Sequence, residues 1–313
     1  GNPRVRQQLA FTLGQWGTAD AAQALGELST QAGDDPWLRA AIVSSALRRP
    51  DEILKVVLRP STAPQVRENF ASPLLGTAVA SDDPEVLENA LIQAAPAGAE
   101  TPERWQFAAL SGLLDAMQRK SVELDSFRNS ANTELRTAVG RITMALRHAR
   151  ELAATESAGE TGRESAIRLL GHESDRQPQD LDLLLKIIQG PAAARLQSAA
   201  LETVGRLRRP NIPDLLLAGW KRHSPSLRNS ILETLLRRNE WAGRILDGVE
   251  QGAIGTREVS AANRQRLIKH FNPALQERAA QLFSAHAPEH RATLVARWQN
   301  DLPPQGDDAR GAL

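Results

Sequence analysis

The strongest constraint on the fold of this chain is a pattern that it uses twice. The two copies run over 36–49 and 225–238 and share the order P-x-L-R-x-x-I-x-x-x-x-L-R-R without a gap. Such internal similarity is typical of stacked helical hairpins, in which each unit buries its apolar face against its neighbours. The pattern therefore favours a repeat array over a fold with one central core.

Prolines that follow Asn, Asp, Ser or Gly mark the same units elsewhere in the chain. These positions are Pro3, Pro36, Pro84, Pro191, Pro225 and Pro273. Pro3 and Pro36 are 33 residues apart, and Pro191 and Pro225 are 34 apart, which matches one helix–turn–helix unit. The other two intervals are 48 residues, which we interpret as a unit with an insertion. Because proline fits the first turn of a helix, each of these prolines is predicted to begin one.

Apolar side chains at helical spacing follow these prolines. Val5, Leu9 and Leu13 form one such stripe, and Leu38, Ile42 and Leu47 form the next. The same reading predicts helices over 3–16, 64–80 and 133–154, among others. No alternation of β-branched residues lasts long enough for a strand. The sequence therefore predicts an all-α fold, a HEAT-type α-solenoid (α-α superhelix) of roughly eight helical hairpins.

Arginine recurs at two kinds of position in the repeats. Arg6, Arg39 and Arg228 lie in the first turn of a predicted helix, where we expect them to bond or ion-pair to neighbouring hairpins. The repeat positions Leu38 and Leu227 precede two of them. Adjacent arginines at 48–49, 208–209 and 237–238 lie near helix ends, where positive charge complements the helix dipole. Alternatively, these pairs line a groove that recognises an acidic partner.

The most flexible-looking connector divides the predicted array. We expect an N-terminal half over 1–155, a connector over 156–162, a C-terminal half over 163–300 and a linker over 301–313. The hairpins are expected to keep stacking across the connector. The stretch 96–131 shows no clear repeat.

Composition excludes several classes of site. The chain has no cysteine, so disulfides, thiolate metal ligands and covalent c-type haem attachment are excluded within it. Its 38 basic and 37 acidic residues give a net charge of +1, which provides no global attraction for nucleic acid or an anionic membrane. No stretch has the length of about 20 apolar residues that a membrane-spanning helix requires. We expect no nucleic-acid partner and no direct membrane insertion.

No arrangement of residues predicts catalysis by this chain. His286 and His290 have the i, i+4 spacing of a metal site, but Pro288 lies between them and no third ligand is near. We interpret both histidines as solvated. The six tryptophans are interpreted as packing groups at hairpin turns, the alternative being stacking on a ligand. No catalytic, metal or cofactor-binding residue is predicted.

Several segments resemble HEAT repeats, which belong to the armadillo-like helical class. The run 2–6 followed by Leu9, Leu13-Gly14, the segment 20–22 and Leu25 follows that pattern. More specifically, the segments 34–45, 239–252 and 264–273 are similar to the HEAT region of large exported haem proteins of planctomycete-type bacteria. The tail over 306–313 is similar to the run that leads into their cytochrome c domain.

This resemblance implies a context that the residues alone do not. In such proteins a β-propeller of the membrane-bound dehydrogenase type precedes the repeats, and a cytochrome c domain follows them. The resemblance implies an exported or periplasmic protein, with haem c in the adjoining domain and none in this chain. The chain would then be a non-catalytic spacer and docking module, with protein partners in cis (the propeller and the cytochrome c-like domain) or in trans.

Two other functional hypotheses remain open. The first is a free-standing HEAT-repeat protein-interaction module without a redox context. The second, from the enzyme class, is a HEAT-like DNA glycosylase or chromophore lyase. The glycosylase requires a cationic groove with a placed carboxylate, which the balanced charge disfavours, and the lyase has no supporting motif.

Overall fold

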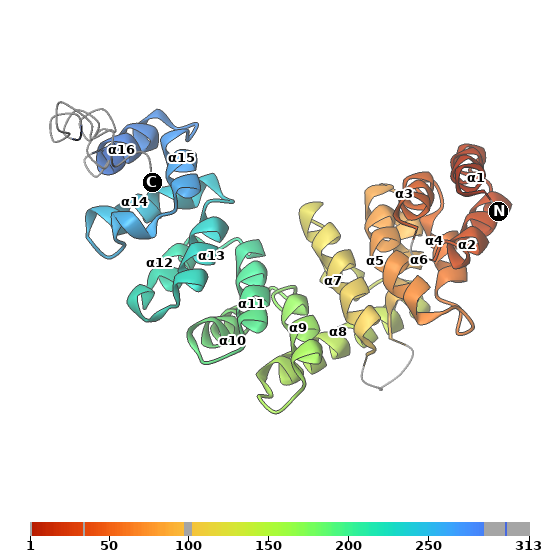
Figure 1. The fold of residues 1–313 in the computed structure, drawn as a ribbon. Helices are drawn as coiled ribbons and strands as arrows, with labels where there is room; N and C mark the ends of the chain where they lie inside the picture. The colour runs from red at the N-terminus through yellow and green to blue at the C-terminus, as the bar shows by residue number, and fades with distance from the viewer. Residues whose placement is uncertain (1, 34, 97–101, 285–297, 299–313) are drawn as a thin grey trace, which may run out of the picture. The chain divides into compact units, whose positions relative to one another are not determined.

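The computed structural model describes residues 2–33, 35–96, 102–284 and 298, and every regular element within them is a helix (Figure 1). The chain forms two compact units, 1–208 and 209–313, called unit 1 and unit 2 below. The predicted all-α fold is confirmed for the described residues. None of the described helices is long and apolar enough to cross a membrane.

Unit 1 holds the first helices of the chain. They are α1 (Pro3–Trp16), α2 (Ala19–Thr30), α3 (Pro36–Ser45), α4 (Pro50–Val57), α5 (Pro64–Ala80), α6 (Pro84–Ala94), α7 (Arg104–Arg119), the 3₁₀ turn η1 (Leu124–Phe127), α8 (Thr133–Ala154), α9 (Glu160–Leu169), α10 (Gln177–Gln189) and α11 (Ala194–Arg206). The predicted bounds of α1, α5 and α8 match those observed.

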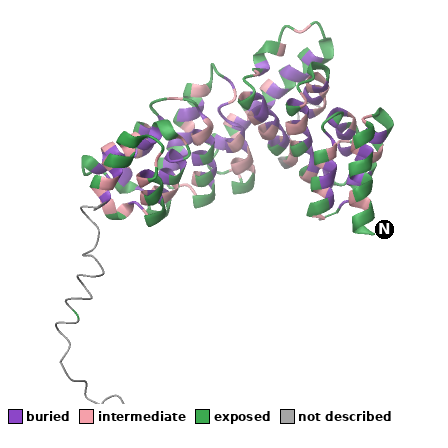
Figure 2. Cartoon of the chain, turned by 90° about the horizontal axis from the view of Figure 1, so that it is seen from above, coloured by how far each residue is buried: buried purple, intermediate pink, exposed green. Residues whose placement is uncertain are grey.

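The helices of unit 1 stack in two series. In one series α1, α3, α5, α7, α9 and α11 each pack on the next member, and in the other α2, α4, α6 and α8 do the same. Sequential neighbours such as α1 and α2 also pack together. Buried residues follow these contact faces, and exposed residues cover the outer sides (Figure 2). This order of contacts is that of an α-solenoid.

Glycine permits the closest helix contacts within the two series. A methyl group at Gly14 of α1 would lie 2.6 Å from Cβ of Ser45 in α3. A methyl group at Gly26 of α2 would lie equally close to Cβ of Val56 in α4. A side chain at either position would force the backbones apart, so the tight stack depends on these glycines.

Unit 2 contains the remaining described helices. They are α12 (Ile212–Leu217), the 3₁₀ turn η2 (Trp220–Arg222), α13 (Pro225–Leu235), η3 (Asn239–Trp241), α14 (Ala242–Glu250), η4 (Thr256–Glu258), α15 (Ala261–Ile268) and α16 (Pro273–Ser284). Within this unit α14 packs on α12, α13 and α16, and α15 packs on α16.

Five of the six marker prolines begin helices as predicted. They are Pro3, Pro36, Pro84, Pro225 and Pro273, the first residues of α1, α3, α6, α13 and α16. The residue before the helix caps it in all five cases; the Asp35 carboxylate, for example, accepts the Trp37 and Leu38 amides of α3 at 3.0 and 3.1 Å. The prediction for Pro191 was wrong, because that residue lies in the turn before α11, which begins at Ala194.

The predicted connector over 156–162 is shorter in the structure. Helix α8 ends at Ala154 and α9 begins at Glu160, within the predicted connector. These two helices pack on each other, and both belong to unit 1. The boundary between the compact units lies in the chain between residues 208 and 209. Apart from residue 298, the end of the predicted C-terminal half (285–300) and the linker over 301–313 lie outside the described residues.

Candidate functional site

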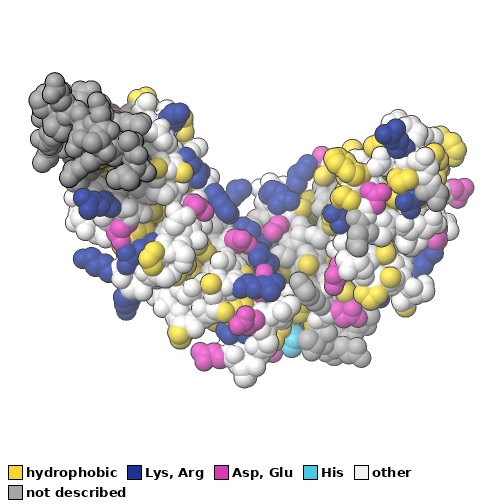
Figure 3. Space-filling model, viewed as in Figure 1, with side chains coloured by type: hydrophobic (Ala, Val, Ile, Leu, Met, Phe, Trp, Pro, Cys, Tyr) yellow, Lys and Arg dark blue, Asp and Glu magenta, His cyan; other side chains and the backbone are white. Residues whose placement is uncertain are grey.

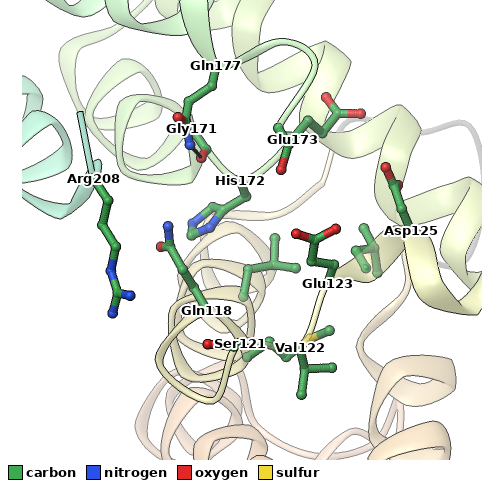
Figure 4. Close-up of a pocket in the computed structure, with 14 residues that line it drawn as sticks. Gln118, Ser121, Val122, Glu123, Asp125, Gly171, His172, Glu173, Gln177 and Arg208 are labelled. Atoms are coloured by element: carbon green, nitrogen blue, oxygen red, sulfur yellow. Dashed lines mark hydrogen bonds between the residues drawn. The ribbon is translucent and has the colours of Figure 1, made fainter. Parts of the chain in front are cut away.

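A polar cavity of about 200 Å³ lies in unit 1, between the turn after α7 and the turn that joins α9 to α10. Polar side chains that line the cavity come from both turns, from the end of α7 and from the end of unit 1. They include Gln118, Glu123, His172, Glu173 and Arg208. In Figure 4 the His172 ring and the Glu123 carboxylate point into the cavity, whereas the Glu173 carboxylate points away from it. The cavity therefore brings a buried histidine next to acidic and basic groups.

Local backbone chemistry forms the turn after α7. Ser121 takes a left-handed conformation with φ of 58°. The amide of Val122 then donates to the Met117 carbonyl at 2.9 Å, which closes the end of the helix. This turn carries the chain from the end of α7 to Glu123 at the cavity.

Asp180 of α10 holds the turn that carries His172. Its Oδ2 accepts the Gly171 amide at 2.8 Å, and the Gln177 side chain donates to the Gly171 carbonyl at 3.2 Å. Gly171 has φ of 85°, a conformation that favours glycine. A methyl group there would also lie 2.6 Å from Cδ2 of Leu207. The position of His172 is therefore fixed by both bonding and packing.

His172 contacts an acidic and a basic group at once. Its Nε2 lies 3.4 Å from Asp115 Oδ1 of α7 and 3.4 Å from Arg206 Nη1 of α11. Arg206 also donates to Asp115 and to the Arg168 carbonyl, the latter at 2.6 Å. Burial, together with the neighbouring Arg206 charge, lowers the pKa of His172 to about 3. Burial raises the pKa of Asp115 above its ordinary value, and Arg206 opposes that shift.

A second buried arginine completes the network. Arg150 of α8 donates from Nε to Asp180 Oδ1 at 2.5 Å and from Nη2 to Glu173. The Asp180 side chain is completely buried and Glu173 is 9 % exposed. The two arginine clusters therefore join α7, α8, α9, α10 and α11 around the turn that carries His172.

These bonds show what the cavity can do chemically. Arg150 and Arg206, which lie beside the cavity, are bonded to carboxylates of the same network, and among the described residues no hydroxyl is hydrogen-bonded to His172 that it could activate as a nucleophile. The part of the chain that the structure describes also contains no cluster of three or more His, Asp or Glu side chains arranged to hold a metal ion. The bonds of Arg150 and Arg206 connect neighbouring helices of unit 1 at a junction around His172.

Sequence reasoning missed this junction. Asp115 interrupts an apolar run of α7, Leu113-Leu114 before it and Ala116-Met117 after it. That interruption is a local signal of a buried, partnered acid. Its partner Arg206 lies 91 residues away, and no spacing rule connects the two.

The predicted repeat arginines differ in their contacts. Arg6 donates to the Gln31 carbonyl at 3.1 Å, within its own hairpin. Arg228 donates to the Trp220 carbonyl at 2.9 Å, to the Lys221 carbonyl at 2.8 Å and to Glu258. Arg39 forms no side-chain hydrogen bond or ion pair among the described residues. The expected common role of the three arginines is therefore absent from the described structure.

The tryptophans differ in how far their side chains are buried. Trp220 and Trp241 are buried, which agrees with the predicted packing role, and an arginine lies over each ring. Trp16 and Trp37, in contrast, are exposed, at 64 and 74 %. Trp298 is also exposed, at 71 %, whereas Trp105 is half-buried beside Arg67. The packing interpretation was therefore wrong for Trp16, Trp37 and Trp298. His286 and His290 lie outside the described residues.

The first helix exposes an apolar stripe that the sequence predicted to be buried. Val5 and Leu9 are 64 and 45 % exposed, although Leu13 of the same stripe is buried. Leu47, predicted to be buried with Leu38 and Ile42, is also exposed. Hydrophobic side chains gather on the surface over α1 and α3 (Figure 3). This N-terminal surface and the cavity in unit 1 are separate candidate sites.

Comparison with known proteins assigns no family to the chain. Neither a protein-family model nor a curated protein matches it.

Proposed function

We propose that this chain is a non-catalytic helical-repeat scaffold whose apolar stripe on α1 is covered by a further α-helix, supplied in cis by another part of the same protein or in trans by a partner. The proposal is carried by one observation, the exposure of Val5 and Leu9 in a helix whose repeat counterpart is fully buried at the equivalent positions.

The repeat interval of 33 residues aligns Val5 with Leu38 and Leu9 with Ile42. Leu38 and Ile42 have no exposed surface. Helix α3 is covered by α1, whereas no described helix covers α1 on the corresponding side. Because apolar surface is stabilised by removal from water, the exposed stripe has the character of an unfilled contact face.

The contact between α1 and α3 supports a specific kind of partner. At that contact α1 offers small residues, and Gly14 allows the close approach to Ser45. Ala10, one turn before Gly14, is fully buried on the same helix. We therefore propose that the covering element is an α-helix, of the same protein or of a partner, that presents small residues four positions apart to Val5 and Leu9.

A peptide with the sequence of residues 2–33 tests this docking, because it carries the small-residue face that already fits α3. Labelled peptide is titrated with the full chain and with Leu9→Glu, and anisotropy is recorded. We expect saturable binding that Leu9→Glu weakens by at least about tenfold, since a charge would be buried in the contact. Gln8→Glu, an exposed change of the same charge, is the matched control.

Equal binding to the wild type and Leu9→Glu, or no saturable binding at all, would reject this docking surface. Thermal unfolding of both variants checks that the fold is retained. Because both side chains are exposed, we expect each to change the free energy of unfolding by no more than about 0.5 kcal/mol.

The biological context is proposed from the sequence resemblance. The similarity of 34–45, 239–252 and 264–273 to the HEAT region of exported haem proteins supports a spacer between a propeller and a cytochrome c domain. The HEAT type of the repeats belongs to the same proposal. Sequencing the gene on both sides of this segment tests it: a C-x-x-C-H motif downstream would support the redox context, and its absence would leave the general docking scaffold.

A further inference from the structure

Unit 2 has an open surface concavity of about 440 Å³ at the end of α15. Leu236, from the segment after α13, lines it together with Arg266, Lys269, His270 and Phe271 from α15 and the residues that follow. Lys and Arg side chains are visible on this part of the surface in Figure 3. The concavity therefore combines positive charge with apolar surface.

The positive charges of the concavity lack carboxylate partners. Arg266 donates from Nη2 to the Leu236 carbonyl at 2.8 Å, and neither it nor the exposed Lys269 has an ion pair among the described residues. Arg237, next to Leu236 in the chain, is exposed and also has no ion pair among the described residues. The nearby Glu240 carboxylate lies 3.8 Å from Arg238. No acidic residue lines the concavity.

Three other arginines of unit 2 pair with carboxylates of the chain itself. Arg228 pairs with Glu258, Arg244 with Asp214 and Asp247, and Arg278 with Asp247 and Glu250. Arg266 and Lys269 at the end of α15 are not neutralised in this way, and a negatively charged partner would complement them.

An aromatic ring gives this positive surface an apolar side. The Phe271 side chain is 73 % exposed. It packs on the His270 ring with 4.7 Å between centroids, which holds it at the edge of the concavity. A large apolar side chain exposed beside unpaired cations is typical of a protein-binding surface.

We propose that this concavity binds an acidic peptide segment that carries one large aliphatic side chain. The peptide carboxylates would pair with Arg266, Lys269 and Arg237, and the aliphatic side chain would lie between Phe271 and Leu236. This site is in unit 2 and has different chemistry from the α1 stripe in unit 1. It therefore does not depend on the function proposed above.

An acidic peptide fits this surface better than a nucleic acid does. A phosphate backbone is bound through many cations along a track, and the chain as a whole carries a net charge of only +1. Here two cations, Arg266 and Lys269, line the concavity together with the exposed Phe271. Tighter binding of single-stranded DNA than of the acidic peptide would overturn the proposal.

The test uses the full chain and fluorescent peptides. The first peptide has a central Leu flanked by Glu and Asp, the second has Ser in place of Leu, and the third has Lys in place of the acidic residues. We expect saturable binding of the first peptide, weaker binding of the second, none of the third, and weakening by added salt. Equal binding of the first and third peptides would reject the charge complementarity.

Variants then locate the site. We expect Lys269→Glu and Arg237→Glu each to weaken binding of the first peptide by about tenfold, which corresponds to about 1.4 kcal/mol. Phe271→Ser should weaken the Leu peptide and leave the Ser peptide unchanged. Lys221→Glu, an exposed charge reversal outside the concavity, is the matched control.

Equal weakening by Lys269→Glu and Lys221→Glu would show diffuse charge attraction and overturn the proposal. If one of the two charge reversals alters the circular dichroism spectrum and abolishes binding, its effect is attributed to misfolding. The other charge reversal then tests the site. The α1 variant Leu9→Glu should bind the acidic peptide normally, so failure of one docking proposal is distinguishable from failure of the other.

Discussion

Each unit contains an arginine that pairs with two carboxylates, but the arrangement is largely buried in unit 1 and exposed to solvent in unit 2. In unit 1 Arg150 lies between Glu173 and Asp180, and the Asp180 side chain has no exposed surface. In unit 2 Arg278 lies between Asp247 and Glu250, and all three side chains are about a third exposed or more, at 35, 35 and 41 %. The comparison indicates that burial, rather than the number of ion pairs, decides how much such a junction matters to stability.

The largest effect is expected from Asp180→Ala. This substitution leaves the Arg150 guanidinium and the Gly171 amide without their shared partner in a buried site. Breaking one side of a buried pair destabilises proteins by about 3 to 5 kcal/mol. Urea denaturation followed by circular dichroism measures the loss.

The neighbouring Asp182 provides the control for Asp180. It lies on the same helix, is exposed, and has no side-chain bond among the described residues. We expect Asp182→Ala to change the free energy of unfolding by no more than about 0.5 kcal/mol. Similar losses in the two variants would contradict the role assigned to burial.

His172 gives the buried junction a pH dependence. Its pKa is lowered to about 3 in the folded chain, against an ordinary value of 6.5. The unfolded chain therefore takes up the proton first as the pH falls, and the stability present above about pH 6.5 is lost progressively below it. We expect the wild type to lose at most about 1.4 kcal/mol per pH unit relative to His172→Gln between about pH 6.5 and about pH 5.

Parallel urea titrations of the wild type and His172→Gln across that range test the prediction. The difference between the two proteins isolates His172 from the carboxylates, which titrate in both. If the free energy of unfolding changed with pH in the same way in both proteins, the imidazole would not be held neutral by its burial against Asp115 and Arg206.

Local chemistry explains which parts of this fold were predictable from the sequence. A proline after a capping residue specifies the start of a helix from neighbouring atoms alone, which is why the bounds of α1 were correct. Pro191 follows Gly190, which has no side chain to cap a helix, and the helix begins three residues later at Ala194.

Long-range packing explains what the sequence did not predict. Val5 and Leu38 occupy equivalent places in the repeat, yet only Leu38 lies in a helix that another helix covers on that side. The repeat pattern is the same at both positions and cannot distinguish them. Likewise, the contact between Asp115 and Arg206 arises only when α7, α9 and α11 stack.

A smaller effect is expected at Glu258, which connects η4 to Trp220 and Arg228 in unit 2. Its Oε2 accepts from Trp220 Nε1 at 2.9 Å and from the Gly255 amide at 2.7 Å. The hydrogen bond from Trp220, supported by the Gly255 amide and Arg228, lowers the pKa of Glu258. At neutral pH we expect Glu258→Gln to lose about 1 to 2 kcal/mol of unfolding free energy.

The direction of this pKa shift adds a second test of Glu258. Because the folded pKa lies below the unfolded one, the carboxylate contributes stability above about pH 4.3 and loses it as the pH falls through the folded pKa. The difference between the wild type and Glu258→Gln should therefore disappear in acid. Glu240→Gln, an exposed change in the same unit, serves as control, and a difference that persists in acid would contradict the assignment.

The smallest effect is expected at Arg278, where the comparison between the units is sharpest. Hydrogen bonds with Glu250 and Asp247 raise the pKa of Arg278, so the guanidinium stays charged. The exposed pairs are nevertheless screened by water and salt, and pairs of this kind contribute about 0 to 1 kcal/mol. Arg278→Met, which keeps most of the aliphatic stem, should lose less than about 1 kcal/mol, and added salt should reduce the loss further. A loss as large as that of Asp180→Ala would mean that the geometry of the bidentate junction outweighs its exposure.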